Sequence, residues 1–244
     1  MSQIKHRQSR LVHGLQHPVK ATQFVLSKFR SQQGQRIAFW DRHFRNIPIE
    51  RVVAAVDEYW KTYRCWSKVQ DLIGGWTDKT ILDVGCGYTS VLNILGGGDR
   101  YGLSIEIEDL RDRPGYFLNK DIRWINGTAE RLPFTPGCFD VVFCNNGVDH
   151  YESPQGSVDE MVRVLKPGGW VVLSINIFET DIGARDSQHH FSFTREKFLG
   201  LLTQFDVMFE KISPVAAQIS RLLEGRVIDT PEEKEMIVVA RLKT

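Results

Sequence analysis

The chain has 244 residues, of which 42% are hydrophobic and 25% are charged, an ordinary composition for a globular protein that buries a substantial core. No apolar run approaches the roughly 20 residues of a membrane-spanning helix, and no N-terminal pattern resembles a secretory signal. The four cysteines lack the spacing of zinc or iron–sulfur sites. We therefore expect reduced thiols and a soluble, cytoplasmic protein.

The net charge of +1 hides a concentration of basic residues near the N-terminus. The first 45 positions carry nine lysines or arginines against one acid, Asp41. Such a segment suits nucleic acid, an anionic membrane surface, an acidic partner or an organellar targeting peptide, and equally a solvated extension. We predict a basic, helical extension over residues 1–47 with no assigned function, followed by one domain over residues 48–244.

Helical periodicity comes first along the chain. Apolar residues three and four positions apart predict a weak helix over residues 18–30 and a long amphipathic helix from Pro48 to Ile73. Pro48 suits the start of the longer helix and Gly74-Gly75 its end. This helix directly precedes the core of the domain, so it is a candidate lid over a neighbouring pocket.

After Gly75, short apolar runs alternate with helical stretches. Helices are predicted over residues 90–95, 108–113, 157–165 and 194–203. Strands are predicted over residues 80–84, 101–105, 122–126, 139–144, 170–178, 207–212 and 236–242. The alternation predicts an α/β fold with a mostly parallel sheet covered by helices on both faces, and the last two strands are expected to pair antiparallel at its edge.

A glycine turn, Gly85-Cys86-Gly87, follows the first predicted strand. Unpaired N–H groups at a helix start, with glycines that let a ligand approach the main chain, suit a nucleotide-like ligand. A phosphate-binding loop would need a lysine after Gly87, and a dinucleotide fold would need a third glycine where Ser90 stands. Asp83, just before the turn, would repel a pyrophosphate but attract a positively charged amino group.

The sequence here resembles the class I S-adenosylmethionine-dependent methyltransferases. Their glycine motif matches "LDVGCG" at residues 82–87, and residues 126–150 and 164–174 match two later segments in the family's order and spacing. The resemblance spans about residues 79–205 and is nearest to the branch that contains quinone-biosynthesis and other small-molecule methyltransferases. It implies a Rossmann-like, seven-stranded sheet, S-adenosylmethionine as cofactor and a small-molecule acceptor, while an RNA or protein acceptor stays open.

The resemblance also implies which residues hold the methionine end of the cofactor. Asp83, Gly85, Cys86 and Gly87 would contact it through the carboxylate and the main chain. Asn145, just past the fourth strand, would border the methyl group.

The ribose and adenine contacts depart from the family pattern. An acid on the second strand commonly binds the ribose hydroxyls, but Ser104 stands at that position, so we choose Glu106, two residues further on the same predicted strand face. Relatives often have Asp before Ala at the adenine, where this chain has Thr128 before Ala129. A hydroxyl can still bond the base.

Methyl transfer from a sulfonium is an in-line displacement that depends on alignment of the acceptor and requires no metal. His150, beside Asp149, is a candidate general base, although a histidine here can also merely brace the loop. His189 and His190, after the fifth strand, are candidates to bind the acceptor or to complete a base. Adjacent histidines are also typical of metal sites, but the sequence offers no clear third ligand, so we expect no metal.

Two other hypotheses remain open at this point. A non-catalytic relative that keeps the fold and cofactor as a scaffold or subunit would suit the departures at Ser104 and Thr128. A nicotinamide-dependent oxidoreductase is disfavoured by Asp83 and Ser90. The "NNGV" sequence after the fourth strand lacks the prolines and aromatic residue typical of amino-methylating DNA enzymes.

Overall fold

The computed structural model describes residues 46–111, 119–184, 189–213 and 234–244, with isolated positions at 34, 37, 38, 42 and 44. The predicted helix over residues 18–30 and most of the predicted extension lie outside these residues. The described helices are α3 (Ile49–Tyr63), α4 (Trp66–Ile73), η1 (Val91–Ile94), α5 (Ile107–Arg111), η2 (Val148–His150), α6 (Pro154–Val164) and α7 (Arg195–Gly200). The described strands are β1 (Thr80–Val84), β2 (Asp99–Ser104), β3 (Ile122–Asn126), β4 (Phe139–Asn145), β5 (Leu165–Ile177), β6 (Phe205–Ser213) and β7 (Lys234–Leu242).

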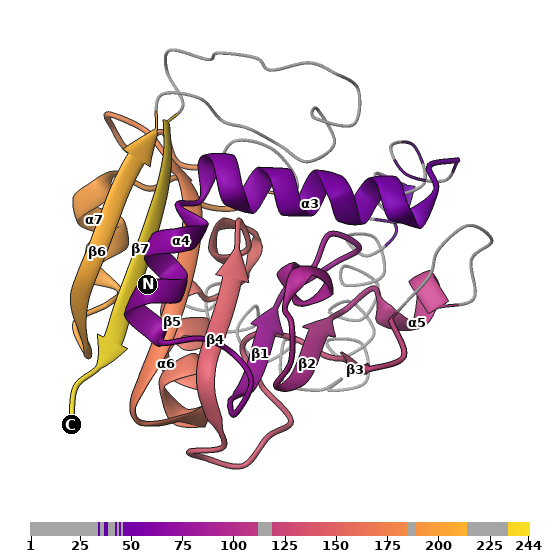
Figure 1. Cartoon of the computed structure of the whole chain (residues 1–244). Coiled ribbons are helices and arrows are strands. Elements are labelled where there is room, and N and C mark those ends of the chain that lie inside the picture. Colours follow the sequence, from indigo (N-terminus) through magenta and orange to yellow (C-terminus); the bar gives the residue numbers. More distant parts are fainter. Residues whose placement is uncertain are drawn as a thin grey trace, which may run out of the picture.

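Seven strands form one sheet in the order β3-β2-β1-β4-β5-β7-β6 (Figure 1). Strands β1 to β5 run parallel to one another, and β7 runs antiparallel to both β5 and β6. The reversed strand β7 therefore lies one place in from the edge, and β6 is the edge strand. This confirms the predicted mostly parallel, seven-stranded α/β sheet with an antiparallel pair at its edge.

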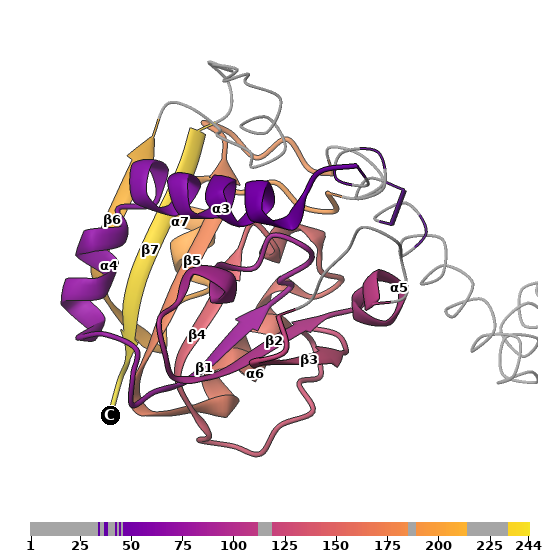
Figure 2. The ribbon, with the colours of Figure 1, turned by 45° about the vertical axis from the view of Figure 1, so that its right-hand side comes forward.

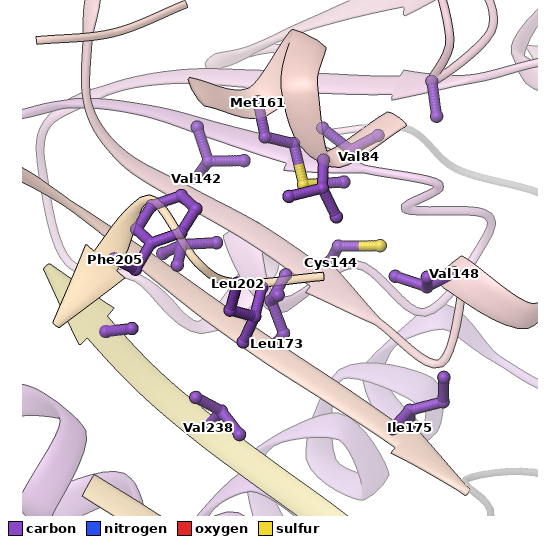
Figure 3. Close-up of a cluster of buried hydrophobic side chains, with 14 of the residues drawn as sticks. Val84, Val142, Cys144, Val148, Met161, Leu173, Ile175, Leu202, Phe205 and Val238 are labelled. Atoms are coloured by element: carbon purple, nitrogen blue, oxygen red, sulfur yellow. The ribbon is translucent and has the colours of Figure 1, made fainter. Parts of the chain in front are cut away.

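Alternate residues of the central strands pack into two separate layers, as the two-residue period of a strand requires. On β4, Val141 and Phe143 join the cluster that includes α3, α4 and η1, whereas Val142 and Cys144 join the cluster that includes α6 and α7. Figure 3 shows part of the second cluster, in which Met161 of α6 lies with Val142. Helices therefore cover both faces of the sheet, as predicted.

The helix predicted from Pro48 to Ile73 is wrong at its middle, because the chain forms two helices there. The break falls at Arg64 and Cys65, and Cys65 has a φ of 51° in the left-handed region. A right-handed helix cannot continue through that conformation. Arg64 is buried with only 1% of its surface exposed, so the break turns a charged side chain inward rather than toward solvent.

Two other predicted elements differ in detail. The helix expected over residues 90–95 is the single 3-10 turn η1. The strand expected from residue 170 begins at Leu165, directly after α6, so the "KPGG" segment lies within β5. The pairing of β4 with β5 shifts between Phe139 and Val141, and this irregularity takes up the extra residues.

Helix α3 crosses the sheet close to the carboxyl ends of β4 and β1 in both views (Figure 1) (Figure 2). Its buried residues include Val52, Val56 and Trp60, a stripe with four-residue spacing. Trp60 meets Phe143 of β4 edge to face, with ring centroids 5.7 Å apart. No helix among the described residues is long and apolar enough to cross a membrane.

Replacement of Phe143 by alanine tests the packing of α3 on the sheet. Phe143 is fully buried and its ring also lies 5.8 Å from that of Trp76. We expect Phe143→Ala to lower the free energy of unfolding by about 3–5 kcal/mol, the usual effect of emptying a buried phenylalanine site. Chemical denaturation measures the change. Ile182→Ala is the control, since Ile182 is 54% exposed, and an equal effect in both variants would contradict the packing described.

Candidate cofactor and acceptor site

A pocket lies at the carboxyl ends of β1, β2 and β3, between the glycine turn and the loop that follows β4. The residues that line it are Gly85, Leu103, Ser104, Ile105, Gly127, Thr128, Ala129, Glu130, His150, Tyr151 and Glu152. The carboxylate of Glu130 accepts a hydrogen bond from the backbone N–H of Glu152 at 2.9 Å, which joins two walls of the pocket. The predicted adenine contacts Thr128 and Ala129 thus lie on the pocket wall.

The glycine turn is folded back onto the end of β2. The N–H groups of Gly85 and Cys86 both donate to the carbonyl of Leu103, at 2.8 and 3.2 Å. Gly85 and Gly87 have φ values of 70° and 49°, a region that glycine adopts without strain. Of the predicted cofactor residues in the turn, Gly85 lines the pocket, whereas Cys86 is buried and is not among the lining residues.

The side chain of Tyr151 covers the turn, a contact that we did not predict from the sequence. A Cβ atom on Gly85 would collide with the Tyr151 hydroxyl, and a Cβ on Gly147 would lie 2.6 Å from the same atom. The hydroxyl is also 3.3 Å from the Cys144 sulfur. An aromatic residue directly after His150 was the only signal in the sequence, and nothing local to it indicates a contact with a turn so far back in the chain.

Asp83 is buried at the end of β1 and only one of its carboxylate oxygens is paired. Ser90 donates to Oδ2 at 2.6 Å, while Oδ1 is buried with no hydrogen-bond partner among the described residues. Burial raises the pKa of Asp83 to about 7, although hydrogen bonds from the Ser90 hydroxyl and the Val91 N–H act in the opposite direction. Ser90, which stands where a dinucleotide fold would have its third glycine, is thus the partner of this carboxylate. Its side chain also caps η1, because it accepts a hydrogen bond from the N–H of Leu92.

A second buried acid, Glu106, also lies near the turn. Glu106 accepts a hydrogen bond from the hydroxyl of Ser104. We predicted that Glu106 shares a strand face with Ser104. This was wrong, because β2 ends at Ser104 and Glu106 lies beyond the strand, just before α5. Burial and the charges of Asp83 and Glu106 together raise the pKa of the Cys86 thiol. Both carboxylates therefore lie near the turn, but Ser104, not Glu106, reaches the pocket wall.

Two of the predicted histidines meet at the edge of this pocket. His150 belongs to η2, and its ring centroid lies 4.4 Å from that of His189, which follows β5. The N–H of His190 donates to the carbonyl of Asp149 at 3.0 Å and anchors the later segment to η2. Asp149 is buried beside them, and its Oδ1 has no hydrogen-bond partner within the described part of the chain.

Comparison with known proteins identifies the fold and the family. Residues 82–173 match the family model described as a methyltransferase domain. This segment includes the glycine turn, Asp83 and every residue that lines the pocket. The chain carries a class I S-adenosylmethionine-dependent methyltransferase domain. This confirms the predicted family and its cofactor, S-adenosylmethionine.

Relatives of the methyltransferase domain include enzymes of quinone biosynthesis. The chain is 30% identical over 113 residues to a ubiquinone biosynthesis O-methyltransferase from Nitrosomonas europaea, over 43% of this chain and 47% of the relative. It is 28% identical to the ubiquinone/menaquinone biosynthesis C-methyltransferase UbiE from Roseobacter denitrificans, over 45% of this chain and 42% of the relative. The chain spans between 31% and 60% of the length of the first five curated relatives that it matches.

Among solved structures, the chain matches one from the complex between the Haloferax volcanii Trm112 methyltransferase activator and a methyltransferase. The TM-score is 0.57 at 19% identity, over 86% of this chain and 95% of that chain. At this identity, the match shows a shared fold.

Asn145 is not among the pocket-lining residues of the methyltransferase domain, and its side chain belongs to a separate polar network. Its side-chain oxygen accepts from the hydroxyl of Ser174 and from Arg64 Nε and the Tyr59 hydroxyl, both at 3.4 Å. Arg64 forms an ion pair with Glu235 and also donates to Tyr59. This polar network holds the end of α3 to β4, β5 and β7. This network could not be predicted from the sequence, because its members come from four separate elements.

Both side chains of the Arg64–Glu235 ion pair are buried. Burial lowers the pKa of Arg64 and raises that of Glu235, because each charge is removed from solvent. The loss of either partner would leave the other charge buried and uncompensated, whereas apolar replacement of both would not.

A double-mutant cycle tests this network. Arg64→Met is expected to lower the free energy of unfolding by about 3–5 kcal/mol, and Arg64→Met with Glu235→Leu by less than that. In Arg64→Met the raised pKa of Glu235 should make the protein more stable in acid and less stable as the pH rises through that pKa. Denaturation at several pH values measures both effects.

Lys61→Met on the same α3 helix is the matched control. Lys61 is 60% exposed and pairs with Asp57 on the surface, so its loss should change the unfolding free energy by less than about 1 kcal/mol. A double variant no more stable than Arg64→Met would show that the pair is not the source of the effect.

Proposed function

We propose that this protein transfers the methyl group of S-adenosylmethionine to a small-molecule acceptor by in-line displacement. The observation that carries the proposal is the unpartnered carboxylate oxygen of Asp83, buried at the glycine turn beside the pocket. A buried carboxylate oxygen without a partner is costly. The ammonium group of S-adenosylmethionine would supply a charge-assisted hydrogen bond at this position.

The rest of the cofactor follows the pocket away from Asp83. The Ser104 hydroxyl, held by Glu106, would meet the ribose, and Thr128 with Ala129 would contact the adenine. Tyr151 lies over the glycine turn, so its side chain would contact the methionine portion or rotate aside when the cofactor enters. This assignment uses the residues that line the pocket and the acids beside it.

The residues expected around the methyl group of the bound cofactor support a small acceptor. His150 lines the pocket and His189 lies against it, while α3 covers the carboxyl edge of β4. Relatives that act in quinone biosynthesis include both an O-methyltransferase and a C-methyltransferase. We infer a small acceptor and leave the methylated atom open.

We further propose that residues 48–244 form one methyltransferase domain in which α3 serves as a fixed lid. The network around Arg64 ties the end of α3 to three strands. Before α3, Phe44 packs edge to face on Tyr88, one residue past Gly87, with ring centroids 5.5 Å apart. The chain that precedes the domain therefore contacts the region of the glycine turn.

Binding of the cofactor is the first test. Calorimetry should show one molecule of S-adenosylmethionine per chain, and Asp83→Asn should weaken the affinity about tenfold or more, because hydrogen bonds between charged groups contribute about 1.5–3 kcal/mol. Asp99→Asn is the matched control, since Asp99 is 67% exposed at the start of β2. Equal affinity in both variants would refute the role of Asp83.

The pH dependence of binding is a second test. In the free protein the pKa of Asp83 is about 7, and an ammonium ligand binds the ionised form, so the affinity should fall about tenfold for each pH unit below 7. By the same shift, this carboxyl stabilises the free protein in acid, and that contribution is lost as the pH rises through 7. Titrations from pH 5.5 to 8 in the wild type and in Asp83→Asn measure it. A slope that persists in Asp83→Asn would assign the titration to another group.

Turnover separates the enzyme from a scaffold that only binds the cofactor. The full chain with S-adenosylmethionine and a panel of phenols, quinols and amines should form S-adenosylhomocysteine and a methylated product. Asp83→Asn should slow this reaction in proportion to its loss of cofactor affinity at low cofactor concentration. Cofactor binding with no product from any acceptor would favour the scaffold.

A further inference from the structure

We propose that Asp149, His150 and His189 bind one divalent transition-metal ion at the wall of the cofactor pocket. The metal site is inferred from geometry alone, whereas its role in binding the methyl acceptor rests on the proposed function. Each of the three side chains offers one ligand atom, and these atoms all lie within 4.8 Å of one another. Neighbouring ligands of a tetrahedral ion with bonds of about 2.0–2.1 Å lie roughly 3.4 Å apart. Small side-chain rotations therefore suffice to close the site.

The burial of the Asp149 carboxylate also points to a bound cation. Asp149 is 2% exposed, and its Oδ1 is a buried oxygen with no hydrogen-bond partner among the residues described. Native proteins leave few such atoms unsatisfied. A cation between the carboxylate and the two imidazoles would satisfy this oxygen.

The fold brings the ligands together from two segments. The 3-10 turn η2 presents Asp149 and His150 as neighbours. The bond from His190 N–H to the Asp149 carbonyl fixes the second segment next to the turn, and the N–H of Phe178 donates to the carbonyl of Phe193 at 2.9 Å to close the loop that carries His189. The sequence suggested the histidines but could not identify Asp149 as the third ligand, because that depends on this tertiary contact.

The ligand set indicates the kind of metal. Two imidazoles and one carboxylate suit Zn²⁺, Co²⁺, Fe²⁺ or Ni²⁺, whereas Mg²⁺ and Ca²⁺ prefer ligand sets made of oxygens. Three protein ligands leave at least one coordination position open. Because His150 lines the pocket, an oxygen or nitrogen atom of the acceptor could take that position. The metal would then orient the acceptor and make its hydroxyl or amine proton easier to lose to solvent.

This arrangement changes the role predicted for His150. A histidine that binds a metal through one nitrogen is held in place and is not free to collect the acceptor's proton with that atom. His150 would therefore hold the ion that activates the acceptor, and would not itself act as the general base.

The test uses the full chain, stripped with a chelator and titrated with Co²⁺, whose visible absorption reports the coordination directly. We expect one equivalent to bind, and Zn²⁺ to displace it. Asp149→Asn and His189→Gln should each weaken Co²⁺ binding about 100-fold or more, since loss of a residue that merely orients a ligand already costs about 10–100-fold. His190→Gln is the matched control, adjacent in sequence but outside the cluster, and should bind as the wild type does.

Each outcome bears on the proposal. Absence of Co²⁺ binding in wild-type protein that still binds S-adenosylmethionine would overturn it, as would affinity unchanged by both Asp149→Asn and His189→Gln, which would place the ion on other histidines. Should Asp149→Asn fail to fold, as judged by thermal unfolding, His189→Gln decides, because His189 is only half-buried. Normal Co²⁺ binding without any S-adenosylmethionine binding would keep the metal site and reject the proposed function.

Discussion

The parallel alignment of β1 to β5 determines where the candidate site forms. It brings the carboxyl ends of these strands to one edge of the sheet, where β1, β2, β3 and β4 each end in polar residues or a glycine turn. The order in which strands are added to the sheet reverses direction between β1 and β4, since β2 and β3 lie on one side of this pair and β5 lies on the other. A crevice at this point is the expected ligand position in an open α/β sheet. The pocket and the histidine cluster both lie there.

That edge also contains several buried polar groups that are not fully satisfied. Asp83, Asp149 and Glu235 each have a buried carboxylate oxygen with no partner among the described residues. Glu235 has Arg64 as its compensating charge, and its network has a structural role in holding α3. Asp83 and Asp149 have no such cation beside them in the described contacts. The proposed ligands, an ammonium group and a metal ion, are both positively charged, and this difference from Glu235 is the physical reason for assigning them there.

Local patterns were sufficient to predict most of the fold. Strands such as β1 and β4 are short apolar runs with both faces mostly buried, so their existence could be inferred without knowledge of their neighbours. Strand β3 was predicted to the residue. Asp83 and the glycine turn were also predictable, because the chemistry lies within a few consecutive residues. The break between α3 and α4 was not, since the buried Arg64 at the break pairs with Glu235 at the far end of the chain. Tyr151 over Gly85 and Asp149 beside His189 were missed for the same reason.

The proposed function depends on the binding of the cationic end of S-adenosylmethionine by Asp83. A crystal structure of the full chain with S-adenosylhomocysteine, which keeps the ammonium group, tests it most directly. We expect the ammonium nitrogen to lie about 2.7–2.9 Å from Asp83 Oδ1, with the ribose beside Ser104 and the adenine beside Thr128. A bound cofactor whose ammonium group lies elsewhere, with Asp83 Oδ1 still unpartnered, would contradict it.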